Sequence, residues 1–451
     1  MKRPVATLTE NPFEFDELFF SVTDKRGVIL FGNEVFTRIS KYSQEKLIGA
    51  PHSLIRHPDM PRSVFKLFWD TLHTDSPIIA YVKNLAADGS YYWVLAFAFP
   101  VAEGYLSIRI KPSSSLLAAV KNIYASTLQV EAEGGMEKSG SYLMAELNKA
   151  GFNNYTEFML HAAFTELSAL QEKTNANHTN ISFSATPLAE ISSKAAIELQ
   201  ECFQRIQSFQ EANQYFSKTM KSLNDGFRNL KYIALNMTIS AAKFGSGVAS
   251  LGVVSKEFSS LSETIQTHIS GLGEFIDTLS EVVQKCALRI VSLQTQMLMV
   301  EFFVRESLRN IESENAFAGL VENRKHFSAL FRTYSAGLEK EISVLDVDLK
   351  SISVQMQDIK KFTTGLEVIR QIGAVESSRD NQVKQTFVHY LDEMRRFIDL
   401  LQSATAGLHE NVLKMQDSSV IVQSKASHIA GDVDAIFDLA AEMTSKKAQP
   451  A

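Results

Sequence analysis

The sequence predicts an α+β domain, with a five-stranded antiparallel sheet and short crossing helices, followed by a long all-α antiparallel helical bundle or coiled coil. Two observations predict this division. Up to about residue 111, short apolar runs are separated by turn residues such as Asp88-Gly89, which is the pattern of strands and hairpins. After Pro112 the chain contains one proline, Pro187, before Pro450, and its apolar residues recur in steps of four and three, as in packed helices.

The composition is that of a folded protein without a nucleic-acid partner. Of the 451 residues, 45% are hydrophobic and 21% are charged, which excludes a wholly disordered chain. The 45 basic and 51 acidic residues give a net charge of −6, and no basic block stands out. Cys202 and Cys286 are too few for a disulfide framework, so a reducing compartment is expected.

The N-terminal residues do not resemble a signal peptide, because no apolar run follows the basic pair near Met1. The most apolar later stretch, Met297 to Val304, contains Glu301 and is far shorter than the ~20 residues of a spanning helix. We therefore expect a soluble, cytoplasmic protein with no membrane span.

Five strands are expected in the first domain, which we assign to residues 1–115. They are predicted at 19–23, 28–31, 78–84, 91–96 and 105–110. Between the second and third strands, a helical pattern is broken by Pro51, Pro58 and Pro61, so several short helices should cross one face of the sheet. Residues 116–190 are expected to form a helical connector.

Four long helices are expected beyond the connector. The apolar rhythm is unbroken from Ile265 to Val304, and a second run from Leu199 to Ala241 has one polar member, Asn213, which is expected to fix the register. Shorter runs follow at 338–359 and 387–401. The apolar stripe is wide, which favours four-helix packing over a two-stranded rope. We assign a first hairpin to 191–320 with its turn at the glycines of 244–248, a second hairpin to 321–446, and a tail to 447–451.

A faint internal repeat relates the two hairpins. Leu230 to Lys243 aligns with Leu366 to Arg379 at a fixed offset of 136 residues. A true repeat would allow one chain to form an intramolecular four-helix bundle. The alternatives are a homodimer, and a chance match between two amphipathic helices.

The segment Pro51-His-Ser-Leu-Ile-Arg-His-Pro-Asp-Met-Pro61 is followed by Phe65, Trp69, Val82-Lys-Asn84 and Asp88-Gly-Ser-Tyr-Tyr-Trp-Val94. This series resembles the PAS domain of bacterial aerotaxis receptors over about residues 12–120. The resemblance implies a PAS fold that binds FAD and reports redox or energy state through the flavin. One departure is Ile78, where the family usually has tryptophan after the proline.

The resemblance implies a set of cofactor-binding residues. Aromatic faces can cover a flavin ring, asparagine amides can bond its pyrimidine edge, and an arginine can pair with phosphate. The implied residues are Asn33, Arg56, His57, Asp59, Phe65, Trp69 and Asn84, with Trp93 as a further candidate.

Each of these residues also has a structural interpretation. Trp69 and Trp93 could be core residues, and Arg56 and Asp59 could pair across a turn. His57 could bond a ligand in the pocket, be a structural histidine, or serve as an axial haem ligand.

The segment Ile233-Ala-Leu-Asn-Met-Thr-Ile-Ser-Ala-Ala-Lys-Phe-Gly245, with its continuation to Ser262, resembles the hairpin tip of methyl-accepting chemotaxis receptors. The resemblance covers a tip near 229–262. It implies contact with a histidine kinase and its coupling protein through Asn236, Ile239 and Lys243. Among the departures, Ser240 stands where the family has glutamate.

These observations predict a signal transducer in which a flavin-bound PAS domain acts through a receptor-like bundle on a protein partner. No phosphate loop, nucleophile motif or metal-spaced histidine cluster is present, so an enzyme is not expected. The alternatives are a ligand-free scaffold for protein contacts and a haem-binding PAS gas sensor.

Overall fold

The structure is a computed structural model that describes residues 4–177, 186–244, 249–309 and 317–447. The predicted glycine turn at 245–248 lies outside these residues. The chain forms two compact units. The first contains residues 1–203, 287–338 and 425–451, and the second contains 204–286 and 339–424.

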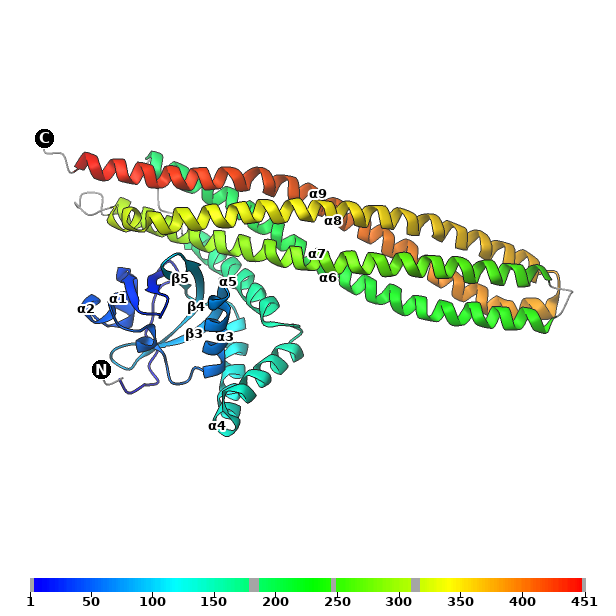
Figure 1. Cartoon of the computed structure of the whole chain (residues 1–451), viewed down its shortest axis with the longest axis horizontal. Coiled ribbons are helices and arrows are strands. Elements are labelled where there is room, and N and C mark those ends of the chain that lie inside the picture. The colour runs from blue at the N-terminus through cyan, green and yellow to red at the C-terminus, as the bar shows by residue number, and fades with distance from the viewer. Residues whose placement is uncertain (1–3, 178–185, 245–248, 310–316, 448–451) are drawn as a thin grey trace. The chain divides into compact units, whose positions relative to one another are not determined.

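The first unit contains the predicted five-stranded antiparallel sheet (Figure 1). Its strands lie in the order β2-β1-β5-β4-β3, and every neighbouring pair is antiparallel. The bounds are β1 Phe19–Asp24, β2 Ile29–Gly32, β3 Ile78–Leu85, β4 Tyr91–Val101 and β5 Gly104–Ile110. With the long helices described below, this confirms the predicted fold class.

Short helices separate β2 from β3, as the prolines predict. They are α1 (Glu34–Ser40), α2 (Gln44–Leu47), the 3₁₀ turn η1 (His52–Ile55) and α3 (Arg62–His73). Pro51 and Pro61 are the residues that precede η1 and α3, where a missing backbone N–H costs no helical hydrogen bond.

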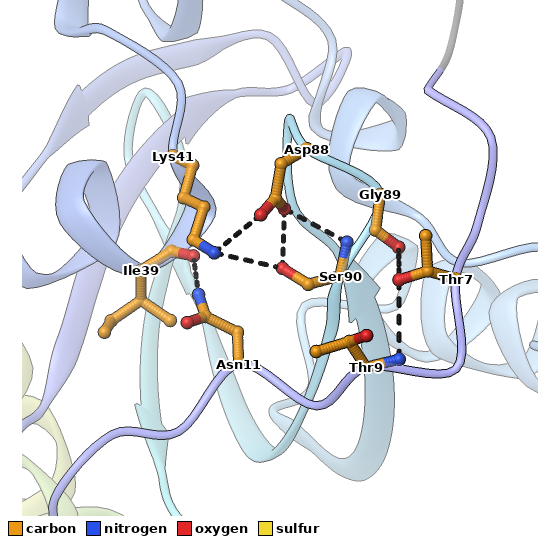
Figure 2. A network of polar contacts seen from close by, with 8 residues as sticks. All are labelled: Thr7, Thr9, Asn11, Ile39, Lys41, Asp88, Gly89 and Ser90. Carbon is orange, nitrogen blue, oxygen red and sulfur yellow. Dashed lines mark hydrogen bonds and ion pairs between the residues drawn. The ribbon is translucent and has the colours of Figure 1, made fainter.

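An N-terminal segment is held against the turn between β3 and β4 (Figure 2). The backbone N–H and the hydroxyl of Thr7 both donate to the carbonyl of Gly89, at 2.8 and 3.1 Å. On the other side of the turn, Lys41 Nζ lies 2.7 Å from a carboxylate oxygen of Asp88. Hydrogen bonds from Lys41 and Ser90 lower the pKa of Asp88 to about 2. The turn is therefore fixed from both sides by polar contacts.

Two connector helices cover part of the other face of the sheet. They are α4 (Leu116–Lys149), which is broken at Gly135 with φ +79°, and α5 (Tyr155–Asn177). The hydroxyl of Tyr81 in β3 donates to Glu166 of α5 at 2.7 Å. The same carboxylate accepts the backbone N–H groups of Ser113 and Ser114, so it joins β3 to the start of α4.

Four long helices follow: α6 (Pro187–Lys243), α7 (Ala249–Arg309), α8 (Ala318–Ser377) and α9 (Asn381–Lys447). Within the first unit, parts of α7 and α8 pack on the sheet. Phe20 of β1 contacts Phe303 of α7 and Phe327 of α8, with ring centroids 5.7 and 5.3 Å apart. Phe99 of β4 contacts Tyr334 of α8 at 5.7 Å.

In the second unit, the four helices pack in a ring. The first helix, α6, contacts α7 through Asn213 and Ser280 and contacts α9 through Phe227 and Phe397. In turn α8 contacts α7 through a hydrogen bond between His268 and Gln355. Ser343 of α8 also accepts a hydrogen bond from Gln423 of α9. Helices α6 and α8 therefore lie at diagonal corners.

The offset of 136 residues extends well beyond the tip segment that first indicated it. Buried positions of α6 coincide with buried positions of α8, and those of α7 with those of α9, without a gap. Matching buried pairs are Phe209/Leu345, Phe216/Ile352, Leu223/Ile359, Leu230/Leu366, Ile265/Leu401, Ile276/Val412, Cys286/Val422 and Leu293/Ile429. The second hairpin is therefore a structural repeat of the first.

Within the part of the chain that the structure describes, α7 is long and apolar enough to cross a membrane, judged by length and composition. The most apolar 18-residue window has a mean hydropathy of 1.3, and 67% of it is buried inside the protein. Core helices of bundles have the same properties.

Candidate functional site

A cavity of about 250 Å³ lies in the α+β domain, between the sheet and the short helices. Its volume is slightly below the ~300–1,000 Å³ typical of small-molecule sites. The sheet contributes alternate residues of four strands, because side chains on one face recur with a period of two. These are Ser21, Thr23, Val82, Asn84, Ala96, Ala98, Tyr105, Ser107 and Arg109.

Aromatic side chains of α3 form the opposite wall. Phe65, Phe68 and Trp69 line the cavity, and Trp69 meets Tyr105 of β5 edge to face at 5.5 Å. The indole also lies against Gly27, where an added Cβ would come within 2.9 Å of it. Gly27 has φ +76°, so both its backbone and its surroundings favour glycine. This wall of the cavity is therefore aromatic and tightly packed against β5 and Gly27.

A buried cation, Arg109, points into this cavity from β5. The residue is 2% exposed. One guanidinium nitrogen, Nη2, donates to Ser21 Oγ at 2.8 Å and lies 2.6 Å from His52 Nε2. The other, Nη1, is buried and has no hydrogen-bond partner among the described residues. Burial lowers the pKa of Arg109 to about 10, so the group remains a cation at neutral pH.

His52 acts as an acceptor for this cation. Burial, together with the charge of Arg109, lowers the pKa of His52 to about 3. The ring is therefore neutral at physiological pH, and its Nε2 accepts from Arg109 while Nδ1 carries the proton. A neutral histidine orients the arginine without neutralising its charge.

Arg109 supplies the buried positive charge of the cavity. Arg26 and Arg56 also line it, but the side chain of Arg26 is 85% exposed and pairs with Asp24 at 3.3 Å. The lining contains no aspartate or glutamate. Arg109 has a cation–π contact with the ring of Phe36 at 5.1 Å but no carboxylate partner in the cavity lining, so burying its charge is costly. A ligand that supplies negative charge or hydrogen-bond acceptors to Nη1 would remove that cost. The site thus favours a planar ligand with an electron-rich edge.

Four of the predicted cofactor residues line the cavity: Arg56, Phe65, Trp69 and Asn84. The guanidinium of Arg56 lies 4.0 Å from the ring centroid of Phe65, a cation–π contact. Asn84 is 2% exposed and lines the cavity, and its side-chain amide makes no hydrogen bond to another described residue. Its side chain is thus available to a ligand.

The other four predicted residues do not line the cavity. Asn33 is the N-cap of α1, and its side chain bonds the backbone of Leu18, Phe20 and Phe36. Trp93 lies on the opposite face of the sheet, 6.3 Å from Tyr124 of α4. Asn33 therefore serves as a helix cap and Trp93 as a packing residue between the sheet and α4.

His57 and Asp59 also have structural partners. The Nδ1 atom of His57 accepts the backbone N–H of Asp59 at 3.1 Å, and Asp59 pairs with Lys83 at 2.6 Å. His57 Nε2 is buried without a hydrogen-bond partner among the described residues, but the residue lies outside the cavity lining. The geometry therefore does not favour His57 as an axial ligand for a group in this cavity.

Sequence reasoning missed Arg109 and His52. Arg109 is a single charge inside the apolar run Tyr105 to Ile110, and the strand period places it on the same face as Tyr105 and Ser107. That alternation was a usable signal. His52 lies in the quoted Pro51 to Pro61 segment, but nothing in the sequence distinguished it from His57.

The predicted partner-binding residues lie on an exposed face of α6. Asn236 and Lys243 are exposed, and Ile239 is 47% exposed. Tyr232 and Leu235 lie on the same side of the helix and are 63% and 59% exposed. At the position where receptors have glutamate, Ser240 instead points inward, 3.3 Å from the hydroxyl of Tyr390.

A family model and a curated relative match the N-terminal domain. Residues 29–106 match the family described as the PAS fold. The aerotaxis receptor of Escherichia coli (strain K12) is 36% identical over 126 residues, which is 27% of this chain and 25% of the receptor. The chain thus covers about a quarter of that relative. A solved structure of the LOV protein RsLOV in a variant form matches with a TM-score of 0.20 and 18% identity, over 30% of this chain and 92% of that one.

Proposed function

We propose that the PAS domain binds a flavin, FAD being the expected form, and that the protein is a redox-responsive signal transducer. The observation that carries this proposal is the buried, uncompensated Arg109 in a cavity walled by aromatic rings. The similarity of the PAS region to an aerotaxis receptor supports a sensing role. A bound flavin would supply reversible electron transfer, with negative charge added to its ring on reduction.

Arg109 is placed to respond to such a change in charge. Its free Nη1 can donate to an acceptor on the ligand, and the strength of that bond depends on the charge that the acceptor carries. The ligand can shift the protein between two states only through contacts that differ between its oxidation states. Arg109 and Asn84 line the cavity, and each is 2% exposed. They are the residues we assign to this contact.

A route from the cavity to the long helices exists within the first unit. Ser21, which accepts from Arg109, is followed in β1 by Val22 and preceded by Phe20. Phe20 points to the other face of the sheet and packs on Phe303 and Phe327. Ser21, which bonds Arg109, and Phe20, which packs on α7 and α8, are therefore adjacent residues of β1. A movement of Arg109 can reach the two helices through this pair.

The partner that we propose is a chemotaxis-type histidine kinase with its coupling protein. The exposed apolar side chains of Tyr232, Leu235 and Ile239, bordered by Asn236 and Lys243, form a suitable helical docking face. In this proposal the protein acts in the cytoplasm and has no catalytic activity of its own.

The absorption spectrum of the purified full-length chain tests the cofactor. We expect flavin bands that bleach with dithionite and are lost in a Trp69→Ala variant. An exposed-position control, Tyr215→Ala, should retain them. A chain that is colourless and cannot be loaded with FAD would support a scaffold, and a Soret band would support haem.

The partner is tested separately by pull-down of a purified chemotaxis kinase and coupling protein. An Ile239→Lys variant should lose this binding while keeping its flavin content. Binding that survives this change would exclude the α6 face.

A further inference from the structure

Helix α8 carries a stripe of exposed valines at seven-residue intervals. Val347, Val354, Val368 and Val375 are 61%, 58%, 50% and 62% exposed, and the missing member of the series is Lys361. All five positions lie on the side of the helix opposite its buried residues. Val347 and Val375 are 28 positions apart, or about 42 Å at the rise of an α-helix.

The internal repeat shows that packing within the bundle does not require these valines. At the same offset of 136 residues, α6 has the charged, exposed Glu211 and Lys218 opposite Val347 and Val354, and Asp225 opposite Lys361. Opposite Val368 and Val375 it has the exposed apolar Tyr232 and Ile239. The two helices therefore differ at Val347 and Val354, where α6 is charged and α8 has exposed valines.

Valine is also an unusual choice for an exposed helical position. It is a weaker helix former than leucine or a charged residue, because its branched Cβ restricts χ1. The buried apolar side chains of α8 are leucine, isoleucine, methionine, phenylalanine and one tyrosine, whereas its valines are all exposed. β-Branched residues repeated every seven positions are typical of the seam between two helices.

We propose that the valine stripe of α8, residues 347–375, is a dimer interface that binds the same stripe of a second copy of this chain in antiparallel orientation. The stripe is symmetric about Lys361, with valines seven and fourteen residues away on each side. A two-fold axis at Lys361 places Val347 beside Val375 of the second copy, and Val354 beside Val368 of the second copy. An interface between identical surfaces requires this self-complementarity.

The charges along the stripe select the antiparallel orientation. In a parallel pair, Lys350, Asp358 and Lys361 would each face their own copy, which is repulsive. In the antiparallel pair, Lys361 faces Lys361 of the second copy, whereas Lys350 and Asp358 no longer face the same residue of that copy. It is already paired with Asp358 at 2.9 Å within its chain, and Asp358 of the second copy lies one helical turn away. The central lysines are therefore compensated.

Sedimentation of the full-length chain at several concentrations tests the interface. We expect a dimer that dissociates on dilution and becomes monomeric in a Val354→Glu/Val368→Glu variant. Exposed positions tolerate these changes, and circular dichroism checks that the helices remain. The matched control is Gln214→Glu/Asn224→Glu on exposed α6 positions, which adds the same charge and should leave the dimer intact.

Three results would overturn the proposal: a monomer at every concentration, a dimer that the α8 variant leaves intact, or a dimer that the α6 control also dissociates. If the stripe binds a different protein instead, the purified chain would be a monomer at every concentration.

Cysteine cross-linking tests the orientation. Chains with Val347→Cys should form a disulfide with chains carrying Val375→Cys, and neither variant should cross-link to itself, because the Cα atoms must approach within about 7 Å. Self-linking of the Val347→Cys chain would overturn the antiparallel arrangement. The native cysteines, Cys202 and Cys286, are buried. Neither experiment depends on a flavin, so its outcome is independent of the proposed function.

Discussion

The ring of Phe20 in β1 stacks on the ring of Phe327 in α8, with a centroid separation of 5.3 Å and 27° between the planes. Both side chains are fully buried. Phe327 also contacts Phe303 of α7 and Phe437 of α9. A strand next to the cavity thus shares one aromatic cluster with three long helices of the same unit.

Replacing Phe327 with alanine should destabilise the first unit by about 3–5 kcal/mol, the usual cost of removing a buried phenylalanine. The change leaves the cavity lining untouched, so flavin content should persist at temperatures where the unit is folded. Thermal unfolding of the full chain measures the loss. Val321→Ala, on the exposed side of α8, is the control and should change the midpoint little. If Phe327→Ala and Val321→Ala lower the unfolding midpoint equally, the aromatic cluster does not stabilise the unit.

Arg109→Met should make a bound flavin harder to reduce, since it removes the buried cation without opening a large void. A tenfold loss of preference for the reduced, negatively charged ligand lowers a one-electron midpoint potential by about 59 mV. Potentiometric titration of the flavin absorbance measures the shift. Arg109→Lys keeps the charge and should retain most of the potential. An unchanged potential in the methionine variant would show that Arg109 does not contact the redox-active ring.

His52 should make the PAS domain less stable as pH falls below 6.5. Its pKa is about 3 in the folded state, so protonation is favoured only in the unfolded chain. The contribution is fully present above pH 6.5 and decreases toward pH 3, by up to about 1.4 kcal/mol per pH unit. His52→Gln should reduce this slope, whereas substitution of the exposed His389 should not.

The measurement for His52 is urea unfolding followed by tryptophan fluorescence. Both tryptophans of the chain, Trp69 and Trp93, lie in the PAS domain, so the signal reports that domain selectively. A slope that is the same with and without His52 would contradict the assigned neutral histidine.

Asn213→Leu should stabilise the second unit by about 1 kcal/mol. Asn213 Nδ2 donates to Ser280 at 2.9 Å, but its Oδ1 is buried without a hydrogen-bond partner among the described residues. The repeat provides the comparison, because the equivalent residue of α8 is the buried Leu349. Helix unfolding followed by circular dichroism measures the change. A lower midpoint would indicate instead that Asn213 is needed for the register.

The period of apolar residues was sufficient to predict the five strands, the crossing helices and the long helices, because each element buries one face. The sequence was less able to predict which residues face the cavity. Trp93 and Asn33 have residue types suited to a flavin. Strand alternation turns Trp93 to the other face, and the Asn33 side chain is hydrogen-bonded to the backbone of Leu18, Phe20 and Phe36. Local sequence cannot show which of two competing uses a polar side chain serves.

Arg109 illustrates the opposite case. The strand period predicts which face of β5 carries Arg109. It does not predict that the cavity lining, to which several elements contribute, contains no aspartate or glutamate to pair with Arg109. Only the assembled cavity shows that the charge is uncompensated. The valine stripe of α8 likewise became visible once burial separated the exposed valines from the core.

The tandem repeat has a genetic consequence. In a symmetric assembly of two identical hairpins, any substitution is present twice, so both sides change together. Here one gene encodes both hairpins, and a substitution at Ile239 leaves its counterpart, Val375, unaltered. The two sides are thus free to diverge under separate selection, as Glu211 and Lys218 of α6 and their counterparts Val347 and Val354 of α8 already have.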